Sequence, residues 1–383
     1  MEIVSSEYIF DGETLHKDKA VLLNNNMVVE IGNIETLKKA YSKATVKDMG
    51  RGVLFPGFVD VHTHLELSHL KNRLPHKADF IKWLKSMMSL KKEHFYEEIV
   101  KQSIKSGLQE LIQSGVRVVG DISNTLATVE YLKRALPLSV VFFENYSLSL
   151  KKSYEIEKSL KENLGDIQLS ASPLRVSAVP HSIYSTNKHL LRYLSKICQP
   201  DLPYSIHYLE HKYENSFAIS KGKLFDYLSK IGLVDDELHY NSASSYLSSI
   251  KAVRNGMIFV HCVYADDKDI DFFKNIDATI GVCARSNVYI SDTLPDLYKF
   301  EKSGVNIAIG TDSLASNYDL NFINELKFIR KHFPNISAQT IFKWATKGGA
   351  KALKVKLGFK KGYFAYPVFF KTSSKNPLEE ILE

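Results

Sequence analysis

Two histidines separated by one residue, His62 and His64, end a short apolar run that begins at Phe58. Side chains two residues apart on a β-strand point to the same face, so both imidazoles can reach one metal ion. The alternative for an isolated pair is two polar residues that hydrogen-bond the backbone at a strand end. The pair by itself therefore indicates a possible metal site and leaves that alternative open.

Residues of metal-binding type end three later β-rich runs. These residues are His207, His261 and Asp312. A lone core histidine is usually a hydrogen-bonded polar group, and a lone aspartate after Gly-Thr is usually a helix N-cap. Chance is a poor explanation for residues of metal-binding type at the ends of four β-rich runs. Three neutral imidazoles and one carboxylate suit Zn²⁺ or Fe²⁺ and leave a position open for water.

Hydrolysis is the chemistry that such a centre predicts. The ion lowers the pKa of a bound water towards neutrality, and a nearby carboxylate can move its proton. Glu210, three residues after His207, is placed for that proton transfer. His211 is a rival ligand, because residues four apart share a helix face. We prefer His207, since it ends the β run, whereas residues 210–214 are typical of a solvent-facing turn.

The elements that must position these residues alternate from residue 57 onward between β-rich runs and helix-patterned stretches, as in repeated βα units. The predicted strands are 57–62, 116–121, 138–144, 174–180, 203–208, 257–263, 277–283 and 305–311. Eight units fit a (β/α)₈ TIM barrel of α/β class, whose catalytic groups lie at the carboxyl ends of the strands. A doubly wound sheet also fits the alternation, but no G-x-G-x-x-G motif follows the first strand.

The two ends of the chain are β-rich outside this alternating region. Residues 1–56 read as short strands with tight turns, and residues 362–370 are strand-like again. We predict a small β-sandwich domain built from both chain ends, residues 1–56 plus about 350–383, beside a barrel of residues 57–349.

Composition narrows the class of protein. The chain has 383 residues, of which 44% are hydrophobic and 24% charged, as in ordinary soluble proteins. The net charge of +7 comes largely from lysines mixed with acids on helix-like stretches, which favours solvated helix faces over a nucleic-acid patch. Three cysteines without a C-x-x-C pair argue against a disulfide framework and a thiolate zinc site.

Location and partners follow from the same numbers. The first residues do not resemble a signal peptide, and no apolar stretch is long enough to span a membrane. We expect a cytoplasmic protein with a small-molecule substrate, no nucleic-acid partner and no membrane partner, and a homodimer is possible. The histidines in polar or helical contexts are expected in surface or structural roles: His69, His76, His94, His189, His239 and His332.

The strand-end residues resemble the amidohydrolase superfamily. The similar segments are, in the order of the family, 52–64, 205–210, 260–262 and 309–313. The resemblance implies four ligands of one divalent metal ion, Zn²⁺ in the first place and Fe²⁺ in the second: His62, His64, His207 and Asp312. It also implies a catalytic set in which Glu210 is the proton shuttle, while His261 and Asp312 polarise the attacking hydroxide.

The fourth predicted strand separates two branches of that superfamily. Bimetallic members carry a carboxylated lysine there, and this chain has no lysine in the strand, so it looks like the mononuclear aminohydrolases of heterocycles. Residues 179–185 are similar to the S-P-H-x-x-Y-S segment of nucleoside and adenosylhomocysteine deaminases, which implies that His181 contacts the substrate.

Two further segments, residues 64–68 and 283–287, look like the aminodeoxyfutalosine deaminases of the alternative menaquinone pathway, which convert a 6-aminopurine nucleoside to its 6-oxo form. This resemblance implies that Glu66 contacts the substrate. In related deaminases a carboxylate holds the ribose hydroxyls, and Glu93 is the corresponding residue by this resemblance.

The expected reaction is hydroxide addition to C6 of a purine nucleoside with release of ammonia. The first expected substrate is 6-amino-6-deoxyfutalosine. Adenosine, methylthioadenosine, S-adenosylhomocysteine and other heterocycles are alternatives on the same scaffold, and a non-catalytic barrel is a remote one. The cytidine-deaminase type of zinc enzyme needs a P-C-x-x-C motif, which this sequence lacks.

Overall fold

A computed structural model describes residues 1–90, 93, 96–234 and 240–383 of the chain. His94 and His239, for which surface or structural roles are expected, lie outside the described residues. The part described has the mixed α/β content that the sequence predicts, and each of the eight predicted strands is present. These strands are β8 (Phe58–Thr63), β9 (Val116–Ser123), β10 (Val140–Asn145), β11 (Arg175–Pro180), β12 (Ser205–Tyr208), β13 (Ile258–His261), β14 (Thr279–Val282) and β15 (Asn306–Ile309).

The eight strands form two parallel four-stranded sheets, in the orders β11-β10-β9-β8 and β12-β13-β14-β15. At one seam the Asp312 N–H donates to the His62 carbonyl over 2.9 Å, and a parallel bridge joins Thr63 to Asp312. At the other seam the His207 N–H donates to the His181 carbonyl over 2.8 Å. The arrangement is of TIM-barrel type, and a continuously hydrogen-bonded eight-stranded barrel stays a prediction.

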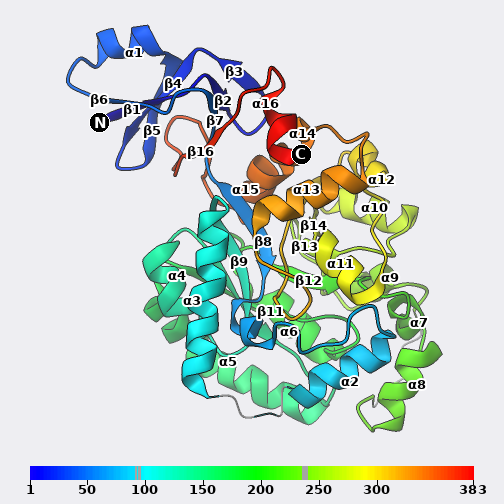
Figure 1. Cartoon of the computed structure of the whole chain (residues 1–383). Coiled ribbons are helices and arrows are strands. Elements are labelled where there is room, and N and C mark those ends of the chain that lie inside the picture. The colour runs from blue at the N-terminus through cyan, green and yellow to red at the C-terminus, as the bar shows by residue number, and fades with distance from the viewer. Residues whose placement is uncertain (91–92, 94–95, 235–239) are drawn as a thin grey trace.

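Helices follow the strands and surround the two sheets (Figure 1). They are η1 (Leu65–Leu70), α2 (Phe80–Leu90), α3 (Glu97–Gln113), α4 (Val129–Ala135), α5 (Leu150–Ala171), α6 (Lys188–Ile197), α7 (Glu214–Ala218), α8 (Gly222–Lys230), α9 (Ala243–Ser249), α10 (Asp267–Asn275), α11 (Ala284–Ser291), α12 (Leu297–Ser303), α13 (Phe322–His332), α14 (Ala338–Lys343), η2 (Trp344–Gly348), α15 (Gly349–Ala352) and α16 (Pro377–Leu382). Several begin at a side-chain cap, such as Asn187, whose side chain accepts the Leu190 N–H. No helix in the described ranges has both the length and the apolarity needed to cross a bilayer.

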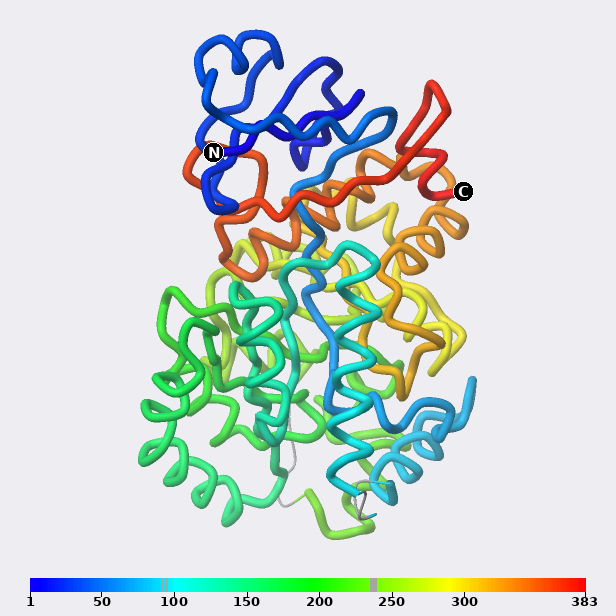
Figure 2. Tube along the Cα trace, turned by 60° about the vertical axis from the view of Figure 1, so that its left-hand side comes forward, coloured from blue at the N-terminus to red at the C-terminus, as the bar shows by residue number. Residues whose placement is uncertain are grey.

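Two small sheets lie beside this region, in the orders β5-β4-β1-β6 and β16-β7-β2-β3. Their strands are β1 (Glu2–Ser5), β2 (Tyr8–Phe10), β3 (Leu15–Lys17), β4 (Lys19–Asn24), β5 (Met27–Asn33), β6 (Thr45–Asp48), β7 (Gly52–Phe55) and β16 (Val368–Lys371), with helix α1 (Ile34–Ala40). Asn25 and Asn26 adopt the left-handed conformation that a tight β4–β5 hairpin requires. The C-terminal strand β16 pairs with β7, so the red end of the chain runs beside the blue end (Figure 2).

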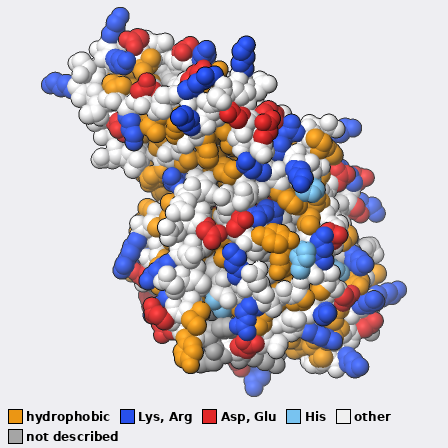
Figure 3. Space-filling view, in the orientation of Figure 1, with side chains coloured by type: hydrophobic (Ala, Val, Ile, Leu, Met, Phe, Trp, Pro, Cys, Tyr) orange, Lys and Arg blue, Asp and Glu red, His pale blue; other side chains and the backbone are white. Residues whose placement is uncertain are grey.

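Apolar side chains from both small sheets pack into one cluster. The buried members are Val4, Ile9, Val21, Leu23, Val28, Leu54, Phe359 and Ala365. On the face shown in Figure 3, Lys and Arg side chains are interspersed with Asp and Glu, as expected of solvated helix faces.

Candidate active site

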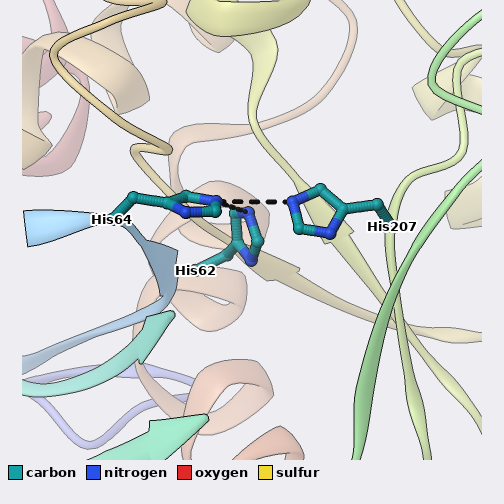
Figure 4. Close-up of side chains that lie close together, drawn as sticks. All are labelled: His62, His64 and His207. Carbon is teal, nitrogen blue, oxygen red and sulfur yellow. Dashed lines mark hydrogen bonds between the residues drawn. The ribbon is translucent and has the colours of Figure 1, made fainter. Parts of the chain in front are cut away.

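His62 and His64 project from the end of β8 towards His207 at the end of β12 (Figure 4). The Nε2 atom of His64 lies 3.1 Å from Nε2 of His62 and 3.3 Å from Nε2 of His207. All three side chains are buried. Three buried nitrogens that converge so closely need a shared proton or cation, because lone pairs on neutral rings repel one another.

The Asp312 carboxylate closes this cluster from the end of β15. Its Oδ1 lies 3.8 Å from Nε2 of His62 and 3.5 Å from Nε2 of His64. Its Oδ2 accepts hydrogen bonds from the hydroxyls of Ser286 and Ser316. One oxygen is therefore anchored by hydroxyls, and the other is directed to the imidazoles.

Electrostatics keep these histidines neutral. Burial, with the neighbouring His207 and His64, lowers the pKa of His62 well below its usual value. Burial and the adjacent His181 lower the pKa of His207 to about 3. Although burial opposes ionisation of Asp312, the nearby histidines, first His261, bring its pKa below the ordinary value. Neutral imidazoles and an ionised carboxylate are the donor forms that bind a metal ion.

The tautomer of His207 also fits a metal site. Nδ1 of His207 lies 3.1 Å from the His181 carbonyl oxygen, to which it donates a hydrogen bond. The lone pair of His207 is therefore on Nε2, which faces the cluster. The donor set of three imidazoles and one carboxylate fits a single Zn²⁺ or Fe²⁺ ion.

Glu210 and His261 lie on one side of the cluster. Nε2 of His261 is 3.8 Å from Oε1 of Glu210, and Nδ1 of His261 is 2.9 Å from the Asn287 side-chain oxygen. Burial and Asp312 raise the pKa of Glu210, while His261 opposes this rise. A carboxylate whose pKa is raised is suited to accepting and returning a proton.

The turn that follows β12 corrects one expectation from the sequence. The polar pattern predicts that residues 210–214 face solvent, yet His211 and Glu214 are buried. The Glu214 carboxylate accepts the backbone N–H groups of Leu209 and His211 over 3.0 and 3.1 Å, which folds the polar segment inward. The His211 ring stacks on Phe80, and His207 occupies the position in the histidine cluster.

A cavity of about 140 Å³ opens above the cluster and is lined by both polar and apolar side chains. The polar wall includes Asn124, Glu144, His181 and Ser185. The apolar wall comes from η1, α2 and α11 and consists of Leu67, Trp83, Leu84, Met87, Met88 and Ile290. His181 thus lies where substrate contact is expected.

The structure does not bring Glu66 or Glu93 to this cavity. Both Glu66 oxygens accept hydrogen bonds from residues 123–125 at the end of β9, and Glu66 is not among the residues that line the cavity. Glu93 forms an ion pair with Arg73 over 2.8 Å. In both cases the carboxylate is engaged by donors elsewhere in the fold.

Asn124 and Glu144 are cavity residues that the sequence reasoning did not select. Both follow the rule that functional groups lie at carboxyl ends of strands, here β9 and β10. That rule could have indicated both residues from the sequence. However, neither has a second polar residue at a recognisable spacing that would mark it as functional.

Comparison with known proteins adds to this geometry. A model of the Amidohydrolase family matches residues 53–382. The aminodeoxyfutalosine deaminase of a Nitratiruptor species is 28% identical over 387 residues, covering 95% of this chain and 89% of that protein. The 5-methylthioadenosine/S-adenosylhomocysteine deaminase of Thermococcus kodakarensis is 26% identical, covering 93% of this chain and 83% of that protein.

Solved structures are similar over the whole chain. The aminofutalosine deaminase of Helicobacter pylori, in complex with methylthio-coformycin, has a TM-score of 0.88 and 26% identity, covering 100% of this chain and 95% of that one. An adenosine deaminase of Xanthomonas campestris with bound zinc has a TM-score of 0.78 at 18% identity, covering 100% of this chain and 88% of that one, and supports the fold alone.

Proposed function

The chain belongs to the amidohydrolase family, and we propose from this that it hydrolyses the exocyclic C–N bond of a 6-aminopurine nucleoside. The observation that carries the proposal is the meeting of four potential ligands with Glu210 and His261 beside one cavity. Of these six residues, His64, His207, Glu210 and Asp312 line the cavity. The deaminase names of the relatives support the reaction type.

The proposed ligands of one divalent ion, Zn²⁺ in the first place and Fe²⁺ in the second, are His62, His64, His207 and Asp312. Such an ion, when bound, makes water acidic enough to supply hydroxide at neutral pH. Asp312 and His261 orient the attacking oxygen towards C6 of the base. Glu210 takes one proton of the water and delivers it to N1. The second proton, on the oxygen added at C6, passes to the amino group, which leaves C6 as ammonia.

For the substrate we propose 6-amino-6-deoxyfutalosine, on the resemblance of residues 64–68 and 283–287 and the names of two similar proteins. Methylthioadenosine, S-adenosylhomocysteine and adenosine are the alternatives, which other relatives' names support. His181, on the polar wall, is proposed to contact the nucleoside.

The organisation of the protein is proposed in the same terms. Residues 57–349 form a closed barrel that carries the site, and residues 1–56 with about 350–383 form a β-sandwich. A cytoplasmic location is consistent with the three cysteines, which are buried and form no disulfide among the described residues: Cys198, Cys262 and Cys283.

Replacement of Glu210 tests the proposal. Glu210→Gln keeps the shape of the side chain and removes its basicity, so turnover should fall by about 10²- to 10⁴-fold while bound metal stays near stoichiometric. Ammonia release from several 6-aminopurine nucleosides is measured beside metal analysis. The matched control is Glu155→Gln on the exposed side of α5, which should retain full activity. Full activity in Glu210→Gln would contradict the assignment.

A further inference from the structure

Asn124 is held on the cavity wall by a buried carboxylate that does not itself reach the cavity. Glu66 accepts the backbone N–H groups of Asn124 and Thr125 over 2.6 and 3.2 Å. It also accepts the hydroxyls of Ser123 and Thr125 over 2.7 and 2.9 Å. Four donors on one carboxylate fix the backbone of this segment, and Asn124 is the member that lines the cavity.

The side chain of Asn124 is fixed as firmly as its backbone. Its Nδ2 donates to the Glu144 carbonyl over 3.1 Å and to Glu144 Oε2 over 2.9 Å. The opposite amide orientation would direct Oδ1 at a carboxylate, which is repulsive, so the network determines the orientation. The amide donors are therefore occupied, and Oδ1 remains as an acceptor that none of the described residues engages.

The chemistry of the proposed substrate identifies the donor that fits this acceptor. A 6-aminopurine nucleoside offers hydrogen-bond donors at two places, its 6-amino group and its ribose hydroxyls. The 6-amino group must lie at the histidine cluster, where the C–N bond is broken. Glu144 separates Asn124 from this cluster, since Glu144 Oε1 lies 3.7 Å from Nδ1 of His207. A ribose hydroxyl is then the donor left for Asn124.

We propose that Asn124 Oδ1 accepts a hydrogen bond from a ribose hydroxyl of the substrate, and that Glu66 and Glu144 are positioning residues for this contact. The inference rests on the proposed function. It places one ribose contact at the end of β9, and it gives Glu66 an indirect role through the segment that it holds.

The test measures a substrate preference. Ammonia release from adenosine, 2′-deoxyadenosine and 3′-deoxyadenosine is followed for the zinc-loaded wild type, Asn124→Ala and Glu66→Gln. The wild type should prefer adenosine over at least one deoxynucleoside by about 5- to 10-fold in kcat/KM, the range for one neutral hydrogen bond. Asn124→Ala should abolish that preference, and Glu66→Gln should reduce it. A ratio of two substrates is unaffected by the fraction of enzyme that is folded.

The control and the contrary outcomes are distinct. Asn145→Ala, at the neighbouring strand end, removes an amide that donates to the Phe143 carbonyl, and it should keep the wild-type preference. If Asn124→Ala lowers kcat/KM equally for all three nucleosides, or if the wild type shows no preference, the ribose contact is wrong while the deaminase proposal stands. If the wild type releases ammonia from no 6-aminopurine nucleoside, the proposed function itself fails, and this inference fails with it.

Discussion

The two ends of strand β8 bury opposite kinds of side chain to the same extent. Phe58 at its start and His62 near its end are both 0% exposed. The ring of Phe58 lies 5.4 to 6.0 Å from the rings of four aromatic side chains of the small sheets and of helices α13 and α14: Phe55, Phe322, Phe342 and Phe370. Aromatic burial of this kind stabilises the fold, with additional gains from ring contacts.

The carboxyl end of the same strand gains little stability from burial. Its imidazoles lose water, and burial opposes their protonation. The comparison teaches that one strand divides its tasks by position: the amino end packs the core, and the carboxyl end carries two of the proposed metal ligands. The two ends should therefore respond to substitution in different measurements.

Metal removal should have the largest effect on turnover, and it should affect only the site at the carboxyl end of β8. Treatment with a chelator is expected to lower turnover at least about 10³-fold, because no water is then activated. Restoring Zn²⁺ or Fe²⁺ should restore activity, and far-UV circular dichroism should show an unchanged fold. Full turnover by protein shown to be metal-free would contradict the proposed centre.

Phe58→Ala should produce the converse result at the amino end. Loss of a buried phenylalanine from a packed cluster is expected to lower the free energy of unfolding by about 3–5 kcal/mol. Turnover per folded molecule should stay near the wild-type value. Urea unfolding and active-site titration measure the two effects, and Phe58→Leu is the milder control. A variant with wild-type stability and low turnover would overturn the division of tasks.

Ser286→Ala should weaken the site without changing the stability much. The Ser286 hydroxyl donates to Asp312 Oδ2, and loss of such a supporting hydrogen bond typically lowers metal affinity about 10- to 100-fold. Competition with a fluorescent chelator measures this affinity. Ser291→Ala on the same helix removes only a bond to the Asn287 carbonyl and should bind metal like the wild type. Equal affinities for both variants would argue against Asp312 as a ligand.

The smallest expected effect is a dependence of the free energy of unfolding on pH. Glu325 is buried near the carboxyl ends and accepts the Arg285 N–H, and burial raises its pKa from 4.5 to about 8. Folding therefore disfavours its ionised form, so the unfolding free energy should fall as pH rises from about 4.5 to about 8. Glu325→Gln should flatten this slope, with a difference on the order of 1 kcal/mol between about pH 5 and pH 8 in urea titrations. Parallel slopes in the two proteins would contradict it.

The sequence predicted those features that depend on local pattern. Apolar runs located the eight strands, and residue type at their ends located His62, His64, His207 and Asp312. The tight turns expected in residues 1–56 include the one at Asn25 and Asn26, a residue type that tolerates left-handed backbone.

Contacts between strands could not be predicted in this way. Glu66 lies two residues after His64 in sequence, but its partners come from the end of β9 and the residues that follow it. The segment that contains His211 has a polar sequence, and only the hydrogen bonds of Glu214 explain its burial. A single acid such as Glu144 has no spacing pattern, so its position against Asn124 is a tertiary fact.

The seam between the first and last of the eight strands has a consequence for how the enzyme acquires activity. The Asp60 carboxylate accepts a hydrogen bond from the backbone N–H of His62. It also accepts the N–H and the hydroxyl of Thr311, which is 251 residues away in the chain. A side chain at Gly310 would come within 2.8 Å of the His62 carbonyl, so the strands meet without room for one. Contacts between residues so far apart in the chain require a long loop to close, which costs conformational entropy. A chain that ends before β15 lacks Asp312, so it cannot assemble the proposed set of metal ligands.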